Sequence, residues 1–249
     1  MNPLILNGGV EMIFGAILAG GVGSRMHRAD MPKQFLPLGD KPIIVHTLEK
    51  FLMCPDFEKV YIGVHRDWIS YTEDLVKKYV SAAASKVCVV CGGSDRNETI
   101  QNIIRSIEAD HGVSDESIIV THDAVRPFVT LRMIEENIRY AKEYGAVDTV
   151  THAVDTIVVS DDGKIISDIP NRARMYQGQT PQSFRISLLK DLYQSLSDEE
   201  KEILTDACKI CVVRNYPVYL VEGSYTNLKI TTPGDYKIAQ AMVGGKILD

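Results

Sequence analysis

The sequence lacks any long apolar segment, and none of its hydrophobic runs approaches the roughly 18 residues that a membrane-spanning helix requires. It also lacks an excess of positive charge, because 27 basic residues stand against 33 acidic ones and the formal net charge is -6. A protein that binds nucleic acid by neutralising its phosphates is normally basic. We therefore expect neither a membrane nor a nucleic acid among its partners, and any cationic site must be local.

Cysteine is scarce as well, and its number, five, is odd, which argues against a complete disulfide framework. Cys88 and Cys91 have the spacing of a metal-binding pair, but they fall in an expected strand, where side chains three positions apart point to opposite faces. We expect the cysteines to pack as small buried apolar side chains. Residues 1–11 lack the basic start of a signal peptide and resemble a leader or tail, so we expect a cytoplasmic protein.

Strand-like and helix-like segments alternate along the chain, which predicts an α/β fold with a mostly parallel sheet flanked by helices, in a single domain over 12–243. Turn residues at 161–164 separate two strand-like runs, and this predicts a β-hairpin that protrudes as an arm at about 150–175. Strands are expected at 12–19, 59–64, 86–91, 117–121, 154–160, 164–169, 216–221 and 228–231, and helices at 43–53, 71–80, 97–108, 130–144, 187–195, 198–209 and from 233.

What the sequence does contain is a glycine cluster directly after the first expected strand. Gly20, Gly21 and Gly23 form this cluster, and Arg25 and Lys33 bring two cations close to it. Glycines let the backbone approach a ligand closely, and their N–H groups can surround an anion. The pattern therefore predicts a bound phosphate chain, with a plain turn between a strand and a helix as the simpler alternative.

A second candidate element, Thr121–Pro127, directly follows another expected strand. Ligands of open α/β sheets bind beyond the carboxyl ends of the strands, so Asp123 is expected on the same side as the glycine loop. A carboxylate facing a polyphosphate is repulsive unless a divalent cation lies between them, which predicts Mg²⁺ held by Asp123 and substrate phosphates. Asp123 as a helix cap or turn residue, and Arg126 as a structural ion-pair partner, are the alternatives. His122 is expected to order or pack this segment.

Two further segments place polar groups at predicted strand ends. The loop Gly92–Thr99 lies between a strand and a helix, where backbone groups can bind an anion or a base edge, although an ordinary capped turn is also compatible. Lys229 lies in an apolar segment before the last helix, so its side chain is either exposed or directed into a cleft.

In this order, the elements resemble the cytidylyltransferase family that activates small polyol phosphates with CTP. The resemblance runs from about residue 13 to about residue 242. Its two familiar branches act on methylerythritol 4-phosphate and on ribitol 5-phosphate. The matching stretches are Leu18–Met26, Pro32–Phe35, Gly92–Arg96, His122–Pro127, Gln179–Gln182, Thr205–Ala207 and Leu228–Thr231.

The resemblance implies a Rossmann-like three-layer nucleotidyltransferase fold and a homodimer in which the arms exchange contacts. It implies three catalytic residues: Arg25 and Lys33 on the triphosphate and the pentacoordinate phosphorus, and Lys229 on the substrate phosphate. Asp123 resembles the carboxylate that holds Mg²⁺. Nucleotide contacts are implied for Leu18, Ala19, Gly20, Gly21, Gly23, Ser24, Arg25, Lys33, Gly93, Ser94, Thr99, Asp123, Ala124 and Arg126, and acceptor contacts for Arg126, Thr156, Arg172 and Lys229, of which Thr156 and Arg172 would reach the partner subunit's site.

The stretches 169–182 and 195–206 are more similar to the ribitol phosphate branch, so ribitol 5-phosphate is the expected acceptor and methylerythritol 4-phosphate the alternative. Two other classes stay open. An NAD-dependent oxidoreductase would need a third glycine where Met26 stands. A non-catalytic nucleotide-binding subunit would have no use for the cations and the carboxylate that occur together here.

Overall fold

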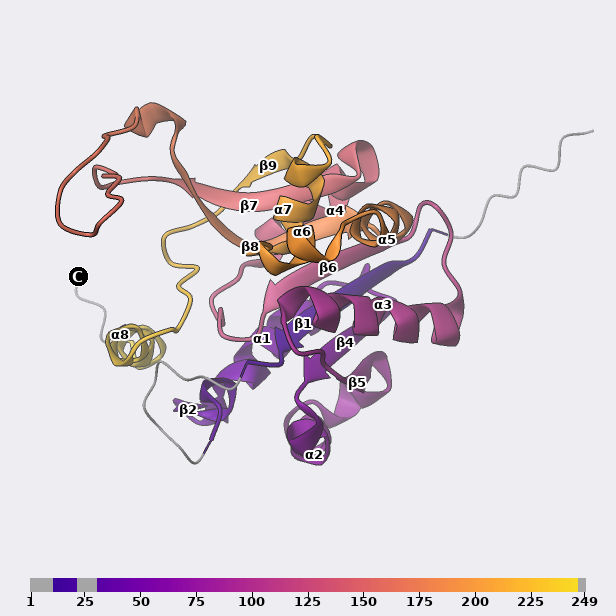
Figure 1. Ribbon diagram of the computed structural model, residues 1–249. Coiled ribbons are helices and arrows are strands. Elements are labelled where there is room, and N and C mark those ends of the chain that lie inside the picture. The colour runs from indigo at the N-terminus through magenta and orange to yellow at the C-terminus, as the bar shows by residue number, and fades with distance from the viewer. Residues whose placement is uncertain (1–10, 22–30, 246–249) are drawn as a thin grey trace, which may run out of the picture.

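The computed structural model describes residues 11–21 and 31–245, and its centre is a seven-stranded sheet (Figure 1). Neighbouring strands pair in parallel except at β8, which runs antiparallel to both β6 and β7. The expected mostly parallel sheet is therefore confirmed. The strand order is β5 (Val87–Cys91), β4 (Lys59–Val64), β1 (Ile13–Ala19), β6 (Ile118–Asp123), β8 (Tyr176–Arg185), β7 (Ala146–His152) and β9 (Tyr219–Glu222).

Helices cover both faces of the sheet because successive residues of a strand point to opposite sides. In β1, Ile13 and Ile17 pack into one apolar layer, and Phe14 and Ala16 pack into the other. This three-layer arrangement confirms the predicted α/β fold class. The first layer contains α1 (Ile43–Leu52), α2 (Ile69–Tyr79) and α4 (Leu131–Tyr144), and the second contains α3 (Arg96–His111), α5 (Ile186–Gln194) and α7 (Ala207–Val213).

Shorter elements complete the fold. The single helix expected over 198–209 is wrong, because α6 (Asp198–Glu202) ends early and Asp206 caps α7 by accepting a hydrogen bond from the Lys209 N–H at 2.9 Å. The last helix, α8 (Pro233–Val243), packs beside the small ribbon of β2 (Pro37–Leu38) and β3 (Lys41–Pro42). Short 3-10 helices lie at Lys33–Phe35, Arg66–Trp68, Ser81–Lys86 and Arg172–Arg174.

Two strand assignments differ from the expectation. The sequence pattern did not predict β8, because its first residues are polar and exposed while Thr180–Phe184 are buried on both faces between β6 and β7. The strand expected at 228–231 is wrong: this segment is irregular, and its backbone hydrogen bonds run from the Leu228 N–H to the Thr226 carbonyl at 2.8 Å and from the Ile230 N–H to the Val125 carbonyl at 2.9 Å. Both differences arise from tertiary pairing, which single-strand periodicity does not report.

The arm between β7 and β8 projects from the body of the molecule, as expected, but it is not a regular hairpin (Figure 1). The predicted turn forms, since the Asp162 carboxylate accepts hydrogen bonds from the N–H groups of Lys164 and Ile165 at 2.8 and 2.9 Å. The two flanking runs meet in a single bridge, Val159 to Asp168. A two-stranded ribbon that has neither a third strand nor a helix packed on it is only marginally stable in water. This explains why the rest of the arm is irregular.

Two expectations drawn from absences can be compared with the structure. Cys54, Cys208 and Cys211 are buried as expected, whereas Cys91 is exposed at the end of β5, so its predicted burial is wrong; all five cysteines are free thiols. Within 11–21 and 31–245, no helix combines the length and the apolar character needed to cross a bilayer.

Candidate active site

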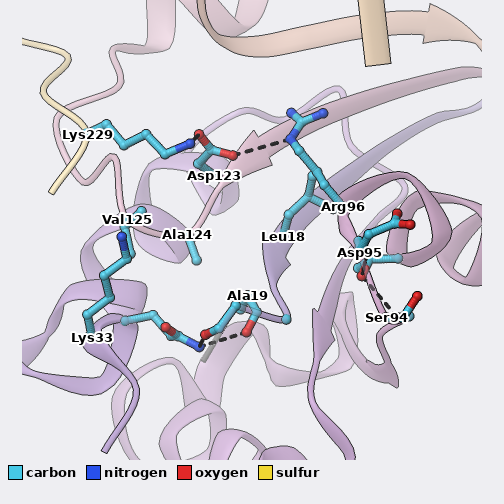
Figure 2. A pocket seen from close by; sticks show the side chains of 15 residues that line it. Leu18, Ala19, Lys33, Ser94, Asp95, Arg96, Asp123, Ala124, Val125 and Lys229 are labelled. Carbon is cyan, nitrogen blue, oxygen red and sulfur yellow. Dashed lines mark hydrogen bonds and ion pairs between the residues drawn. The ribbon is translucent and has the colours of Figure 1, made fainter. Parts of the chain in front are cut away.

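A pocket of about 250 Å³ opens where β1 and β6 end and where the loop after β5 enters α3 (Figure 2). Its position agrees with the rule that ligands of open α/β sheets bind beyond the carboxyl ends of the strands. The structure thereby brings together four sequence segments that lie up to about two hundred residues apart. The lining residues are Leu18, Ala19, Gly20, Gly21, Lys33, Gln34, Gly93, Ser94, Asp95, Arg96, Thr99, Asp123, Ala124, Val125 and Lys229.

The end of β1 forms one wall of the pocket, together with the 3-10 helix Lys33–Phe35. Buried Gln34 donates hydrogen bonds to the carbonyls of Ala19 and Gly21 at 2.7 and 3.1 Å and so fixes the start of the glycine loop. Phe35 is anchored by stacking on Trp68, with ring centroids 4.9 Å apart. These two buried neighbours hold Lys33 at the pocket, where Figure 2 shows its side chain below Val125. The predicted residues Gly23, Ser24 and Arg25 lie outside the described residues.

The loop between β5 and α3 forms the opposite wall. Thr99 is 2% exposed, and its hydroxyl accepts a hydrogen bond from the Gly93 N–H at 3.0 Å and donates one to the Asp95 carbonyl at 2.7 Å. The Glu98 carboxylate accepts from both the N–H and the hydroxyl of Ser94 at 2.6 Å. A Cβ on Gly93 would come within 2.4 Å of Glu98, so the tight turn requires glycine here. The side chains of Ser94 and Thr99 thus shape the loop that lines this side of the pocket.

Three cations converge on Asp123 at the end of β6. Its Oδ1 lies 3.5 Å from Nε of Arg96, and its Oδ2 lies 2.9 Å from Nζ of Lys229 and 3.4 Å from Nε of Arg126. Arg96 and Lys229 reach the carboxylate from opposite sides (Figure 2). Burial by itself would raise the pKa of Asp123, but the charges of Arg96, Lys229 and Arg126 outweigh it and hold this pKa well below the usual range. Asp123 is therefore ionised at neutral pH.

His122 and Arg126 lie beneath the pocket and do not line it. The His122 ring is buried between the Arg126 carbonyl, at 3.1 Å, and the Thr180 hydroxyl, at 2.9 Å. Burial lowers the pKa of His122 to about 4, so this ring is neutral at pH 7 and packs the segment, as its sequence context indicated. The guanidinium of Arg126 donates to the Asn227 carbonyl at 2.8 Å, in addition to its contact with Asp123. Arg126 thus joins β6 to the segment that carries Lys229.

Lys229 is positioned by residues on both sides of it in the sequence. Asn227 is buried, and its amide donates hydrogen bonds to the Thr180 carbonyl at 2.8 Å and to Gln179 Oε1 at 3.1 Å. On the other side, the Ile230 N–H binds the Val125 carbonyl. The backbone is therefore fixed while the side chain of Lys229 stays 41% exposed, and of the two alternatives left by the sequence, the structure selects the one in which it points into a cleft.

The two predicted acceptor contacts on the arm, Thr156 and Arg172, are exposed and do not line this pocket. Arg172 instead donates a hydrogen bond to the Val154 carbonyl within the arm at 3.0 Å. Within one chain, the structure brings Lys33, Asp123 and Lys229 together but leaves these two residues apart from them.

Sequence reasoning missed four of the lining residues: Gln34, Asp95, Arg96 and Val125. All four stand inside stretches that carry the family resemblance, which is the signal that could have found them. Asp95 is the N-cap of α3, where its carboxylate accepts a hydrogen bond from the Glu98 N–H at 2.8 Å. Val125 carries no chemical signal of its own beyond that resemblance.

A pocket beyond the ends of parallel strands, with two glycine-containing walls, lysines and a buried ionised carboxylate, defines a phosphate-handling nucleotide site of the α/β class. Comparison with known proteins gives the family. Residues 13–245 match the IspD family, described as 2-C-methyl-D-erythritol 4-phosphate cytidylyltransferase. The chain belongs to this family of cytidylyltransferases and is thus a nucleotidyltransferase. This membership argues against the NAD-dependent and the non-catalytic alternatives.

Individual relatives agree with this assignment. The chain is 57% identical over 232 residues to the ribitol-5-phosphate cytidylyltransferase of Streptococcus pneumoniae serotype 2 (strain D39 / NCTC 7466), covering 93% of this chain and 99% of the relative. The solved 2-C-methyl-D-erythritol 4-phosphate cytidylyltransferase of Francisella tularensis is 26% identical, with a TM-score of 0.74 over 92% of this chain and 98% of that one. The 4-diphosphocytidyl-2C-methyl-D-erythritol synthase of Anaerococcus prevotii DSM 20548, at 24% identity and a TM-score of 0.76, covers 94% of this chain and 99% of its own and supports the Rossmann-like fold.

Proposed function

We propose that this protein transfers CMP from CTP to D-ribitol 5-phosphate and releases pyrophosphate and CDP-ribitol, an activated unit for wall teichoic acid or another ribitol-phosphate polymer. The observation that carries the choice of acceptor is the 57% identity over nearly the full length to a ribitol-5-phosphate cytidylyltransferase. The proteins with the methylerythritol name match much less closely, at 24% and 26% identity. Methylerythritol 4-phosphate is the second candidate because the family description carries its name.

The chemistry needs no protein nucleophile. A phosphate oxygen of the acceptor attacks the α-phosphorus of CTP in line, the bond from the α-phosphorus to the bridging oxygen breaks, and pyrophosphate leaves with that electron pair. A phosphate monoester is already ionised at neutral pH, so little general-base help is required. The protein must instead hold two anions close together and neutralise the charge that develops. Lys33 on one side of the pocket and Lys229 on the other suit this task, and Arg25 is expected to join them.

We infer that the reaction uses Mg²⁺ at Asp123. The chemistry of the donor set supports this: Asp123 is an ionised carboxylate that lines the pocket, and among the described residues no group of three His, Cys, Asp or Glu side chains could hold a metal alone. Mg²⁺ is commonly held by one or two carboxylates together with substrate phosphates. When bound, the ion would neutralise phosphate charge and orient the triphosphate. Asp123 would hold it, while Lys229 turns from the carboxylate to the acceptor phosphate.

We also propose that the arm completes the site of a second copy of the chain. Six apolar side chains of the arm are between 41% and 72% exposed: Val154, Val158, Val159, Ile165, Ile166 and Ile169. Several large apolar side chains exposed on one projecting segment are typical of an interaction surface. The proposal gives Thr156 and Arg172 a role that they lack within one chain, namely contact with the acceptor in the partner subunit.

Pyrophosphate release from CTP tests the proposed function directly. We expect turnover with ribitol 5-phosphate and Mg²⁺, a product with the mass of CDP-ribitol, little turnover with methylerythritol 4-phosphate, and loss of activity in EDTA that Mg²⁺ restores. Turnover with methylerythritol 4-phosphate alone would overturn the choice of acceptor. Failure with both acceptors would overturn the assignment to this pair of reactions, and full activity in EDTA would contradict the role of Mg²⁺.

A further inference from the structure

Arg96 lines the pocket and carries a positive charge, but the family resemblance assigned it no role. It is the first residue of α3, and Asp95 caps the helix directly before it. Its side chain is 20% exposed and crosses from α3 to the end of β6, where Nε lies 3.5 Å from Oδ1 of Asp123. Figure 2 shows its two terminal nitrogens pointing away from the centre of the pocket. Arg96 is therefore placed to act on Asp123 rather than on a ligand.

The terminal nitrogens of Arg96 have an unusual environment. Both Nη1 and Nη2 are buried, and neither has a hydrogen-bond partner among the described residues. A buried donor without a partner costs stability, and an arginine kept only for the fold would normally have its N–H groups paired. Natural proteins tolerate such a cost mainly at functional sites. The contact with Asp123 thus explains why an arginine occupies this position.

The face of the sheet that carries Asp123 also carries other polar residues. Thr121, Gln182 and Asp148 lie side by side in register across β6, β8 and β7. Asp123 is two residues after Thr121 in the same strand and so lies on the same face as Thr121. The positive charge of Arg96 acts on Asp148 as well as on Asp123. The guanidinium of Arg96 therefore contacts the pocket carboxylate of Asp123 and also favours the ionised form of Asp148.

The three cations around Asp123 differ in their freedom to move. Lys229 is 41% exposed, whereas the side chains of Arg96 and Arg126 are 20% and 10% exposed. Arg126 is further held by the Asn227 carbonyl. When Lys229 turns toward an acceptor phosphate, the two arginines remain on the carboxylate. Of these two, Arg96 approaches Oδ1 and Arg126 approaches Oδ2.

We propose that Arg96 is a positioning residue whose guanidinium holds the Oδ1 side of Asp123, so that the carboxylate keeps one orientation toward the cation and the triphosphate. The proposal rests on the proposed function, because the task of Asp123 belongs to that function. A guanidinium suits this role because it stays charged at any physiological pH and is planar. Removing a group that orients a metal-binding carboxylate typically lowers the metal affinity or the activity by about 10- to 100-fold.

The test compares Arg96→Met and Arg96→Lys with Arg105→Met, which removes an exposed arginine from the same helix. We expect Arg96→Met to weaken Mn²⁺ binding in the presence of CTP by about 10-fold, measured by electron paramagnetic resonance without acceptor, and to lower kcat by a similar factor. The KM for ribitol 5-phosphate should change by less than about twofold, because Lys229 is intact. Arg96→Lys should recover part of the Mn²⁺ affinity, and Arg105→Met should match the wild type.

The outcomes separate this proposal from the proposed function. Wild-type Mn²⁺ affinity in Arg96→Met would overturn the positioning role, and so would a loss confined to melting temperature or shared equally by Arg105→Met. If Arg96→Met does not fold, Arg96→Lys carries the same comparison. If the wild type releases no pyrophosphate with either acceptor, the proposed function fails, while the Mn²⁺ titration still decides whether Arg96 orients Asp123.

Discussion

At the scale of single residues, Asp123 is surrounded by more positive charge than one carboxylate can neutralise. Arg96, Arg126 and Lys229 each lie within 3.5 Å of one of its oxygens. Under the proposed function, this surplus charge is what lets a protein with a net charge of -6 receive two phosphorylated substrates at one site. Composition gives only the net charge of the whole chain, whereas the fold concentrates cations where β6 ends.

Asp148, behind this cluster, gives a prediction about pH. Burial, the largest cause, raises its pKa to about 6, although hydrogen bonding from Gln182 opposes the shift. The folded protein therefore keeps this proton to higher pH than the unfolded chain, whose pKa is about 3.9. The contribution of Asp148 to the free energy of unfolding is thus fully present below about pH 4 and is lost as the pH rises through about 6.

The side chain of the variant Asp148→Asn does not ionise, so the variant should gain stability relative to the wild type as the pH rises from 4 to 7. We expect a difference in the free energy of unfolding on the order of 2 kcal/mol at pH 7 and a much smaller one at pH 4. Urea unfolding at both pH values measures it, and Asp115→Asn, at an exposed position, serves as the control. A difference between Asp148→Asn and the wild type that does not change with pH would contradict the assigned shift.

At the scale of elements, the turn from β5 into α3 is built so tightly that one methyl group should disturb it. A Cβ at Gly93 would lie 2.4 Å from the Glu98 side chain and 2.8 Å from its backbone carbon. We expect Gly93→Ala to cost about 1–3 kcal/mol of stability, because overpacking shifts the backbone. The KM for CTP should rise more than kcat falls, since this loop forms a pocket wall.

Gly178 in β8 provides the matched control, because a Cβ there meets its nearest atom at 3.8 Å. Thermal unfolding and steady-state kinetics of Gly93→Ala and Gly178→Ala make the comparison. Equal behaviour of the two variants, in both stability and KM for CTP, would contradict the tight packing of the loop.

The same elements explain how far sequence reasoning reaches. The strand preceding Gly20 and the helix following Asp95 have strong local patterns. The strand forms within one residue of its expected bounds, and the helix starts one residue earlier and ends three residues later than expected. Strand β8 was not predicted from the sequence because its buried part depends on pairing with β6 and β7. The segment around Lys229 was expected as a strand, yet side-chain and backbone hydrogen bonds from Asn227 and Ile230 fix it as an irregular connection.

Site residues divide in a similar way. Lys33, Asp123 and Lys229 belong to motifs with recognisable chemistry, and the structure gathers them around one pocket. Arg96 stood inside a recognised stretch, but nothing in the sequence shows that its side chain crosses to β6. Contacts between distant elements of this kind depend on the packing of α3 on the sheet, which no local pattern encodes.

At the scale of the whole molecule, the position of the arm predicts sites shared between two subunits. The arm projects from the body (Figure 1). Arg172 belongs to a short 3-10 helix in the arm and does not line the pocket of its own chain. If Arg172 serves the partner subunit, each complete site combines Lys33 of one chain with Arg172 of the other. Size-exclusion chromatography with light scattering should then give a dimer, and both Lys33→Ala and Arg172→Ala should be nearly inactive as homodimers.

A purified heterodimer of Lys33→Ala with Arg172→Ala distinguishes sharing from action within one chain. With shared sites, one pocket carries both lesions and the other carries none, so the heterodimer should recover about half of the wild-type turnover. With action within one chain, each pocket keeps one lesion and no activity returns. The heterodimer of Lys33→Ala with Lys229→Ala is the control, because both residues line the same pocket and no arrangement leaves a site intact. Recovery in the control as well would show wild-type contamination, whereas recovery in the first heterodimer alone establishes that the arm acts across the dimer.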